Sequence, residues 1–345
     1  MKFLLIYLII GSISAFLMGF LVYGVLKRLG VVDKPSERSS HQTPTVRGGG
    51  IIVLAPFLGS LGYVGLRSTD IVALALALAL TSIALVALLD DLYSVSQIAR
   101  FMSHVLGALV LIGVLMKEDF FILSAWGATI NGTVWVLLFL WLVGYANAFN
   151  FMDGVNGLAT VQVIITTSLV SGILASIGAL ESDALLVCVS ILVGALGFLP
   201  HNFPSARMFL GDIGSMSLGF GLAGLAVWVA SQYGWWLMVP ISLIHANFVL
   251  DPLLTMFRRM FVVPGWWRPH REHFYQRLLR SGVNHSVVTG SQGGIQVVFL
   301  FLILGSAFSS TLIRVLILTA VIAVWLSYFG ICEWRFRRTQ RVVSK

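Results

Sequence analysis

The sequence is poor in charge and in cysteine. Only 10% of its 345 residues are Asp, Glu, Lys or Arg, and 58% are hydrophobic, whereas soluble domains carry about 25% charged residues. This composition excludes a soluble globular enzyme, a disordered chain and a nucleic-acid-binding domain. The two cysteines, Cys188 and Cys332, lie in or at the end of apolar runs and share no local motif, which argues against a disulfide framework or a cysteine metal site.

Long apolar runs fill most of the chain. They are continuous, as in residues 71–89, and do not alternate with polar residues, which excludes a transmembrane β-barrel. At roughly 20 residues per span, the sequence predicts an all-α, polytopic integral membrane protein with about 11 transmembrane helices. The first apolar run is too long for a signal peptide. The helices are predicted at residues 3–26, 48–66, 71–89, 98–116, 132–149, 154–178, 184–200, 213–231, 235–256, 292–309 and 311–332.

The basic residues are distributed unevenly between the two sides that these helices define. Of the 22 basic residues, 18 lie on the side of loop 27–47, and the other four are Lys2, Arg67, Lys117 and Arg314. Because Lys and Arg are retained on the cytoplasmic side, the sequence predicts an outside N-terminus and a cytoplasmic C-terminus. We expect one domain over residues 1–345 with cytoplasmic loops at 27–47, 90–97, 201–212 and 257–291.

Five acidic residues lie tight against helix ends on this side: Asp90, Asp91, Asp153, Asp212 and Asp251. A carboxylate at membrane depth costs about 2.5–3.5 kcal/mol or more, so their shared level indicates a site that a cation occupies. Adjacent carboxylates also repel. Asp90 and Asp91 therefore indicate a magnesium or general-base site, or alternatively a polar helix end that meets water.

A polar segment follows the helix predicted at 132–149. Asn147, Asn150 and Asp153 recur every third residue, so a helical turn would group them on one face. Amide and carboxylate oxygens suit Mg²⁺ and sugar hydroxyls. An amide-rich contact between helices is the alternative.

The segment from Asn202 to Ser215 leads into the helix predicted at 213–231. Asp212 can bind a metal, and free backbone N–H groups at the helix start would face an anion. Arg207, somewhat earlier, could hold a phosphate through its guanidinium group.

The loop 257–291 contains a basic stretch with His270, Arg271 and His273. The histidines could bind zinc, but no cysteine lies nearby, and phosphate binding together with Arg271 is favoured. A basic loop anchored by the tryptophans at 266–267 and touching anionic lipid is the alternative.

Loop 27–47 supplies further cations, namely Lys34, Arg38, His41 and Arg47, for an anionic ligand. Three successive glycines, 48–50, predict a flexible entry to the next helix. A positive loop that serves only topology is the alternative. Together, these segments provide carboxylates for a metal and cations for phosphates on one face, as a diphosphate substrate requires.

In this order the segments resemble the polyprenyl-phosphate N-acetylhexosamine-1-phosphate transferases, glycosyltransferase family 4. The resemblance covers nearly the whole chain and rests on residues 44–50, 90–91, 147–159, 202–215 and 270–277. It implies transfer of N-acetylhexosamine-1-phosphate from a UDP-sugar to undecaprenyl phosphate, with release of UMP. The implied location is the cytoplasmic face of the bacterial inner membrane.

Residues 270–277 look most like the subgroup that initiates O-antigen synthesis. This implies a 6-deoxy donor such as UDP-N-acetylfucosamine or UDP-N-acetylquinovosamine, and O-antigen or another surface polysaccharide as the product; a UDP-GlcNAc transferase is the alternative. The chain departs from the family at Ser94, where Lys is frequent, and at Asn156, where many members have Asp.

The resemblance and the residue chemistry together suggest roles. We expect Mg²⁺, or Mn²⁺, on Asp212, Asn150 and Asp153, with Asp153 also catalytic and Asp90 or Asp91 taking the proton of the lipid phosphate. One-step and covalent two-step routes stay open, as does a homodimer. The expected substrate-binding residues are Lys34, Arg47, Asn147, Asn156, Asn202, Arg207, His270, Arg271 and His273.

Two other classes fit the helix count. A secondary transporter would place ionisable residues near mid-bilayer in broken helices, often in two repeated halves. The acids here lie at one surface, and the sequence has no half-to-half repeat. A membrane scaffold would not need polar chemistry in costly positions. The expected partners are therefore a UDP-N-acetyl sugar, undecaprenyl phosphate and membrane lipid.

Overall fold

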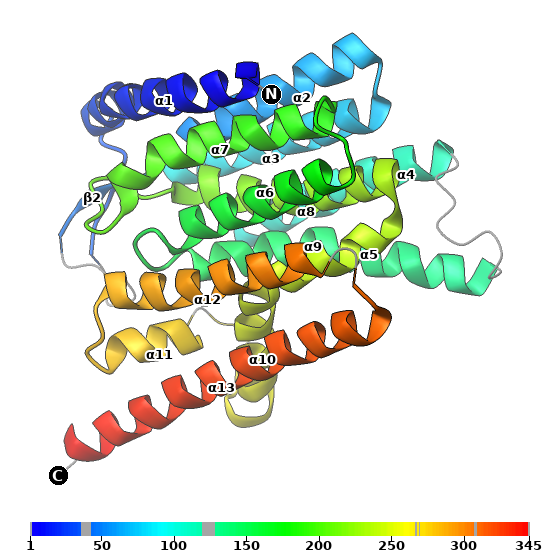
Figure 1. Ribbon diagram of the computed structural model, residues 1–345. Coiled ribbons are helices and arrows are strands. Elements are labelled where there is room, and N and C mark those ends of the chain that lie inside the picture. Colours follow the sequence, from blue (N-terminus) through cyan, green and yellow to red (C-terminus); the bar gives the residue numbers. More distant parts are fainter. Residues whose placement is uncertain are drawn as a thin grey trace.

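The computed structural model describes residues 2–35, 43–118, 128–265, 268, 270–306 and 309–343, of which 128–131 and 343 are described by their backbone alone. The chain forms a bundle of long, roughly parallel helices (Figure 1). The elements are α1 (Lys2–Arg28), β1 (Val32–Asp33), β2 (Thr45–Val46), α2 (Ile51–Ser68), α3 (Ile71–Tyr93), α4 (Gln97–Lys117), α5 (Ala128–Met152), α6 (Leu158–Ser176), α7 (Asp183–Asn202), α8 (Gly211–Tyr233), η2 (Trp235–Leu237), α9 (Met238–Ile244), α10 (Ala246–Val262), α11 (Phe274–Arg280), α12 (His285–Gly305) and α13 (Thr311–Val343).

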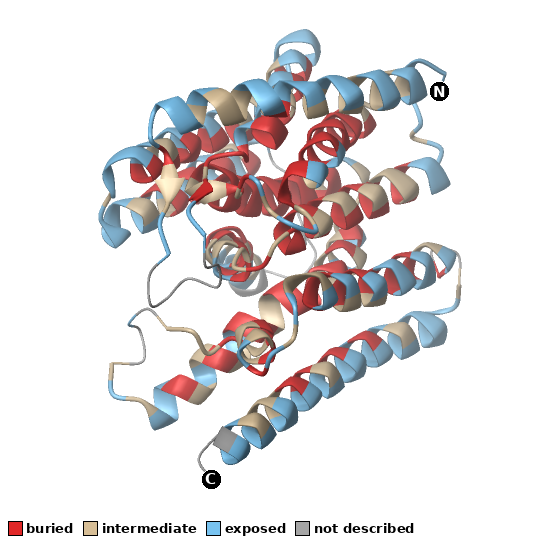
Figure 2. Ribbon diagram, turned by 90° about the vertical axis from the view of Figure 1, so that its left-hand side faces the viewer, coloured by how far each residue is buried: buried red, intermediate tan, exposed pale blue. Residues whose placement is uncertain are grey.

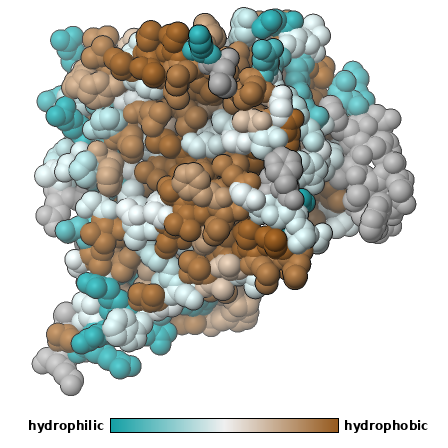
Figure 3. All heavy atoms as spheres, in the orientation of Figure 1, coloured by the Kyte–Doolittle hydropathy of each residue, from teal (hydrophilic) through white to brown (hydrophobic). Residues whose placement is uncertain are grey.

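Most of these helices can cross a membrane. Among the described residues, 10 helices are long and apolar enough, and the number rises to 11 if η2–α9 and α10 count as one bent span. Hydrophobic side chains cover much of the face drawn in Figure 3, as a lipid-facing surface requires. The prediction of an all-α polytopic membrane protein with about 11 spans is confirmed.

Three predictions about where helices begin, end or continue are wrong. The helix predicted at 235–256 is not continuous, because the chain bends by 70° between its parts. The last helix continues to Val343 instead of ending at 332, and the loop predicted at 257–291 is largely helical. Hydropathy marks only where an apolar run ends. A helix can continue beyond that point, because many basic and polar residues also favour the helical conformation.

Side chains cap several helices at their first turn. Asp70 accepts the N–H groups of Val72 and Ala73 at 3.0 and 2.9 Å at the start of α3. Ser96 and Ser182 cap α4 and α7 in the same way. Each cap satisfies N–H groups that have no partner within the helix and stabilises it by roughly 0.5–2 kcal/mol. These caps explain why new helices begin directly after the short connections at 69–70, 94–96 and 177–182.

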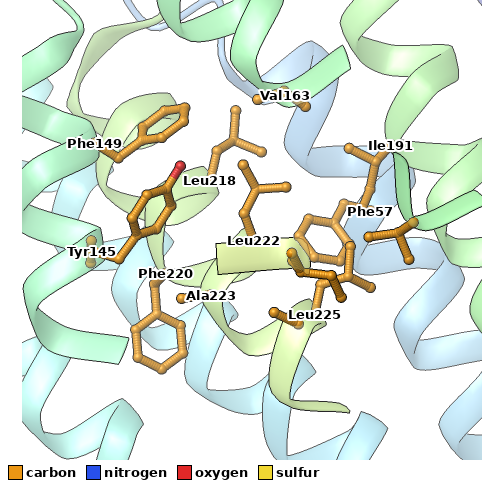
Figure 4. Packing of buried hydrophobic residues seen from close by; sticks show 14 of the residues in the cluster. Phe57, Tyr145, Phe149, Val163, Ile191, Leu218, Phe220, Leu222, Ala223 and Leu225 are labelled. Atoms are coloured by element: carbon orange, nitrogen blue, oxygen red, sulfur yellow. The ribbon is translucent and has the colours of Figure 1, made fainter. Parts of the chain in front are cut away.

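The central helix of the bundle is α8. Its most apolar 18-residue window is entirely buried, whereas only 6% of that of α1 and 22% of that of α13 are buried. Leu222 packs between side chains such as Phe57 of α2 and Phe149 of α5 (Figure 4). Helix α5 comes so close that a Cβ on Gly219 would lie 3.0 Å from the Cα of Ala146. The N-terminus of α8 is therefore fixed in the middle of one end of the bundle.

That end carries the loops that concern function, and we call it the acidic face. It comprises residues 29–35, 43–50, 90–97, 150–157, 203–214 and 270–284. It lies at the left of Figure 1 and faces the viewer in Figure 2. The short β1–β2 hairpin belongs to it, and Val46 of this hairpin also bridges Met208.

The distribution of basic residues predicts that the acidic face is cytoplasmic. Gln97 is exposed at this face, and Glu181 is exposed between α6 and α7 at the opposite end. In spheroplasts, we expect a membrane-impermeant maleimide to label Glu181→Cys directly and Gln97→Cys only after permeabilisation. The buried Cys188 and Cys332 give little background. The reverse labelling pattern would contradict the predicted orientation.

Candidate active site

Carboxyl groups from three segments meet at the acidic face. Asp90 and Asp91 lie near the end of α3, Asp153 follows α5, and Asp212 lies in the first turn of α8. Burial raises the pKa of Asp153 well above its usual value, and the negative charges of Asp212 and Asp91 raise it further. These helix ends therefore bring together four of the five acids that the sequence placed on this side.

Asp91 acts as a cap for a helix that is distant in sequence. Its side chain is almost fully buried and accepts the backbone N–H groups of Asp212 and Ile213 at 3.1 and 3.0 Å. The Nε of Arg47 lies 3.5 Å from its Oδ1. A carboxylate at a helix N-terminus is stabilised by the free N–H groups and by the helix dipole. Asp91 thereby joins the end of α3 to the start of α8.

This arrangement changes the interpretation of two features. The first N–H groups of α8 were expected to face an anionic substrate, but those of Asp212 and Ile213 already bind Asp91. Arg47 was expected to bind substrate, but its Nη2 donates to the carbonyl oxygen of Asp91 at 2.6 Å. Both groups hold the scaffold of the site together instead of projecting freely toward a ligand.

The negative charge of Asp90 is also compensated by neighbouring groups. Its Oδ2 accepts from Nη1 of Arg100 at 2.7 Å, and its Oδ1 accepts the backbone N–H of Val95 at 2.6 Å. The ion pair and the cap hold the turn between α3 and α4. The carboxyl of Asp212 lies within interaction range of Asp90, which is therefore a neighbour of the unpaired acids.

Asp153 and Asp212 differ from the capping pair. In the described part of the chain, neither forms an ion pair with a cationic side chain. Asn150 lies beside α8, since its Oδ1 accepts from Ser215 Oγ at 2.8 Å. Partly buried carboxylates without a cationic partner favour a bound cation. The sequence prediction of a cation site therefore points to these two side chains and to Asn150.

The oxygen donors present fit Mg²⁺. Mg²⁺ commonly takes one or two protein carboxylates and completes its shell with water and substrate phosphates. Over the described residues, no group of three or more His, Cys, Asp or Glu side chains could hold a metal. The site is therefore suited to an ion shared between Asp212, Asp153 and a phosphorylated ligand, and not to a closed cage or a zinc centre on His270 and His273.

Asn202 was expected to bind substrate, but it is committed to the backbone. It is 3% exposed, its Oδ1 accepts the N–H of Gly157 at 2.9 Å, and its Nδ2 donates to the carbonyl of Met208 at 3.0 Å. The hydroxyl of Thr160 donates to the same Oδ1. Asn202 thus ties the loop before α8 to the start of α6 and positions the site without facing a ligand.

The other two asparagines are less restricted. Asn156 donates its Nδ2 to the carbonyl of Pro204 at 3.2 Å, and Asn147 donates its Nδ2 to the carbonyl of Val143, one turn back, at 2.7 Å. Neither side-chain oxygen has an assigned donor among the described residues. Both can still accept a hydrogen bond from a substrate.

The predicted cations lie around the edge of the site. Lys34 is exposed directly after β1. Arg207 lies over the ring of Phe20, with its Cζ 5.9 Å from the ring centroid. Arg38 and His41, also predicted to contact an anion, lie outside the described residues.

A second buried aspartate organises the loop after α10. Asp251 is fully buried, and its Oδ1 and Oδ2 accept the N–H groups of Phe274 and Tyr275 at 3.0 and 3.1 Å. Its Oδ1 also lies 3.1 Å from Nδ1 of His273. Asp251 therefore caps α11 and orients His273. From the sequence, Asp251 was one of five acids near helix ends and had no assigned role. Its position inside an apolar run was the feature that could have indicated a structural role.

The two histidines are adjacent, with ring centroids 4.9 Å apart. Because Asp251 holds Nδ1 of His273, Nε2 is the ring nitrogen left for another partner, and the residue is 3% exposed. Burial, together with the neighbouring His273, lowers the pKa of His270 to about 4, so His270 is neutral at pH 7 and can bind a phosphate only as a neutral partner. The tryptophans at 266–267 lie outside the described residues.

Tyr275 connects this loop to the acids and was missed by the sequence analysis. Its hydroxyl donates to the carbonyl of Phe151 at 2.7 Å. A Cβ on Gly154 would overlap that hydroxyl, so only glycine fits next to Asp153. In the sequence, the glycine directly after Asp153 was the feature that could have indicated this close contact. Tyr275 thereby sets the loop with His273 beside Asp153.

The chain is similar in sequence to proteins of known families. The model of the family described as Glycosyl transferase family 4 matches residues 73–230, a range that contains all four clustered acids. The chain is 28% identical over 339 residues to the "Probable undecaprenyl-phosphate N-acetylglucosaminyl 1-phosphate transferase" of Bacillus subtilis (strain 168), covering 94% of this chain and 88% of the relative.

Two further relatives are similar over most of their length. The chain is 34% identical over 298 residues to the "Decaprenyl-phosphate N-acetylglucosaminephosphotransferase" of Mycobacterium leprae (strain TN), covering 76% of this chain and 73% of the relative. It is 28% identical over 274 residues to the "Phospho-N-acetylmuramoyl-pentapeptide-transferase" of Limosilactobacillus fermentum, covering 72% and 82%.

Asp91 and Asp212 are neighbours, but their substitution should have opposite effects on stability. Asp91→Ala leaves Arg47 and two helix N–H groups without their partner, which should cost about 3–5 kcal/mol and lower the melting temperature. Asp212→Asn removes repulsion from neighbouring acids, so its melting temperature in EDTA should equal or exceed that of the wild type. Differential scanning fluorimetry of purified protein measures both. Equal destabilisation by the two substitutions would contradict the division between capping and unpaired acids.

Proposed function

The chain belongs to glycosyl transferase family 4, and we propose that it transfers N-acetylhexosamine-1-phosphate from a UDP-sugar to undecaprenyl phosphate, with release of UMP. One observation carries the proposal: two partly buried carboxylates, Asp153 and Asp212, form no ion pair among the described residues and share a face with His273. A divalent ion and a diphosphate would complete this site together.

For the donor sugar we propose N-acetylglucosamine. The names of the Bacillus and Mycobacterium relatives specify that sugar, and both relatives align over most of their length. A 6-deoxy sugar such as N-acetylfucosamine or N-acetylquinovosamine is the second candidate, because residues 270–277 resemble the O-antigen subgroup. N-acetylquinovosamine lacks only the C6 hydroxyl of N-acetylglucosamine, and N-acetylfucosamine also differs in the configuration at C4. A site distinguishes such hydroxyl groups by hydrogen bonding.

The reaction joins two anions, so it depends on positioning and on charge neutralisation. When bound on Asp212 and Asn150, Mg²⁺ supplies that neutralisation. His273, oriented by Asp251, and Arg271 hold the phosphates of the donor. The lipid phosphate oxygen forms a bond to the phosphorus that bears the sugar, and the bond from that phosphorus to the oxygen of UMP breaks.

We assign proton removal from the lipid phosphate to Asp153, in place of Asp90 or Asp91. The oxygens of Asp90 and Asp91 already accept hydrogen bonds from Arg100 and from backbone N–H groups. The carboxylate of Asp153 has no such donor assigned among the described residues, so it can accept a proton. We place this chemistry at the cytoplasmic surface of the bacterial inner membrane, from the bias of basic residues.

The proposal is tested with purified protein, undecaprenyl phosphate and a panel of UDP-N-acetyl sugars. We expect UMP release and a lipid-linked pyrophosphoryl sugar, detected by mass spectrometry, with UDP-N-acetylglucosamine as the best donor. EDTA should abolish turnover, and Mg²⁺ should restore it. A preference for a 6-deoxy donor would support the second candidate. UMP release that EDTA does not affect would contradict the metal site.

Removal of the proposed proton acceptor should affect chemistry more than binding. For Asp153→Asn we expect kcat to fall by about 10²–10⁴-fold, with KM for the donor changed far less. Asp183→Asn, at the opposite face, where the carboxylate accepts from Ser68, is the matched control and should keep wild-type kcat. Near-wild-type turnover of Asp153→Asn would return the role to Asp90.

A further inference from the structure

A group of polar side chains lies inside the bundle below the acidic face. The mechanism uses none of them, yet each is at most 2% exposed. Polar groups at membrane depth are costly unless they are hydrogen-bonded, and they mark functional positions. We call the group the amide cluster; it consists of Tyr145, Gln162, Thr166, His245, Asn247, Gln292 and Gln296.

The amide cluster surrounds the break between α9 and α10. Helix α9 ends at Ile244, α10 begins at Ala246, and the two axes differ by 70°. A continuous helix would pair the carbonyl of Ile244 with the N–H of Phe248, but the helix is interrupted at His245, which belongs to neither α9 nor α10. The carbonyl of Ile244 accepts from the side-chain amides of Gln162 and Gln296 at 3.3 and 3.2 Å.

The residue at the break is also held by its side chain. The Nδ1 of His245 contacts the hydroxyl of Tyr145 and lies 3.3 Å from Nε2 of Gln162. Its neighbour Asn247 accepts from Gln296 through Oδ1 at 2.9 Å. Side-chain amides therefore satisfy the carbonyl of Ile244 at the break, as non-helical backbone at this depth requires, and they also contact the side chains of His245 and Asn247.

Proline does not explain the position of the break. A proline inside a helix removes the bond to the carbonyl four residues earlier. For Pro240 and Pro252, these carbonyls belong to Trp236 and Phe248, and not to Ile244. An inserted side-chain donor is the other recognised cause of a sharp kink, and it is present here.

The direction in which α10 leaves the bundle determines where Asp251 lies. In Figure 1, α10 runs across the direction of its neighbours. Asp251 lies less than two turns beyond the break and binds the N–H groups of Phe274 and Tyr275 and the imidazole of His273. An α10 that continued straight from α9 would carry Asp251 away from α11.

We infer that Gln162, Gln296 and His245 are positioning residues: they fix the exit angle of α10 and, through Asp251, the location of His273. The kinetic part of this inference rests on the proposed function, because it assigns donor binding to the loop that carries His273. The structural part does not depend on it.

The structural part is tested by distance measurement. Gln296→Met and Gln162→Met remove the amide donors while keeping a side chain of similar length. Spin labels on cysteines at the exposed positions Val262 of α10 and Leu137 of α5 report the angle by double electron–electron resonance. We expect one narrow distance distribution in the parent protein and a broader or shifted one in each variant. The control is Thr167→Val, since this buried hydroxyl bonds only carbonyls of its own helix.

The kinetic part separates positioning from general stability. Gln296→Met should raise KM for the UDP-sugar by about tenfold or more, because small misplacements of binding groups weaken binding strongly. KM for the polyprenyl phosphate and the melting temperature should stay near those of Thr167→Val. If Gln296→Met does not fold, Gln162→Met, which leaves Gln296 to bind Ile244, is measured instead.

An unchanged distance distribution in the variants would overturn the inference, whether or not the protein transfers sugar phosphate. A donor KM equal to that of Thr167→Val would overturn it as well. Absence of any transfer by the parent protein would instead overturn the proposed function, and the distance measurement alone would then decide the positioning role.

Discussion

A carboxylate buried at the edge of a membrane must be compensated, and the five aspartates at or beside the acidic face, Asp90, Asp91, Asp153, Asp212 and Asp251, meet this requirement in different ways. Asp91 and Asp251 accept the N–H groups that begin α8 and α11. Asp90 pairs with Arg100. Asp153 and Asp212 have no such partner among the described residues, so a bound cation and the substrate are left to provide it. The acids whose charge is compensated by helix N–H groups or by arginine thus hold the site together, whereas the two without such partners are available for binding and catalysis.

The same interactions assemble the site from distant segments. Asp91 joins α3 to α8, Asp251 joins α10 to α11, and Tyr275 joins α11 to the end of α5. The central, fully buried α8 provides the fixed point, and the bent span provides the direction of the loop that carries His273. A rigid scaffold of this kind suits phosphoryl transfer, in which correct placement of charges supplies much of the rate.

The apolar runs and the one-sided acids could be read from the sequence, because both are local patterns. The cap of Asp91 on Asp212 could not, since 121 residues separate the partners and an acid that caps looks like an acid that binds metal. Hydropathy is continuous across 235–256, so it gave no sign of the bend. The three glycines predicted a flexible entry, but a Cβ on Gly50 would overlap Gly214. Gly50 is needed for close packing between backbones.

The central claim is that Asp212 holds the cation of a transferase and that Asp153 lies beside it. Crystals soaked with Mn²⁺ and a UDP-sugar would test it most directly, because anomalous scattering locates the ion without reference to activity. We predict one strong peak within bonding distance of Asp212 and adjacent to Asp153. A peak on the histidine loop, or none at these acids with the nucleotide bound, would contradict the claim.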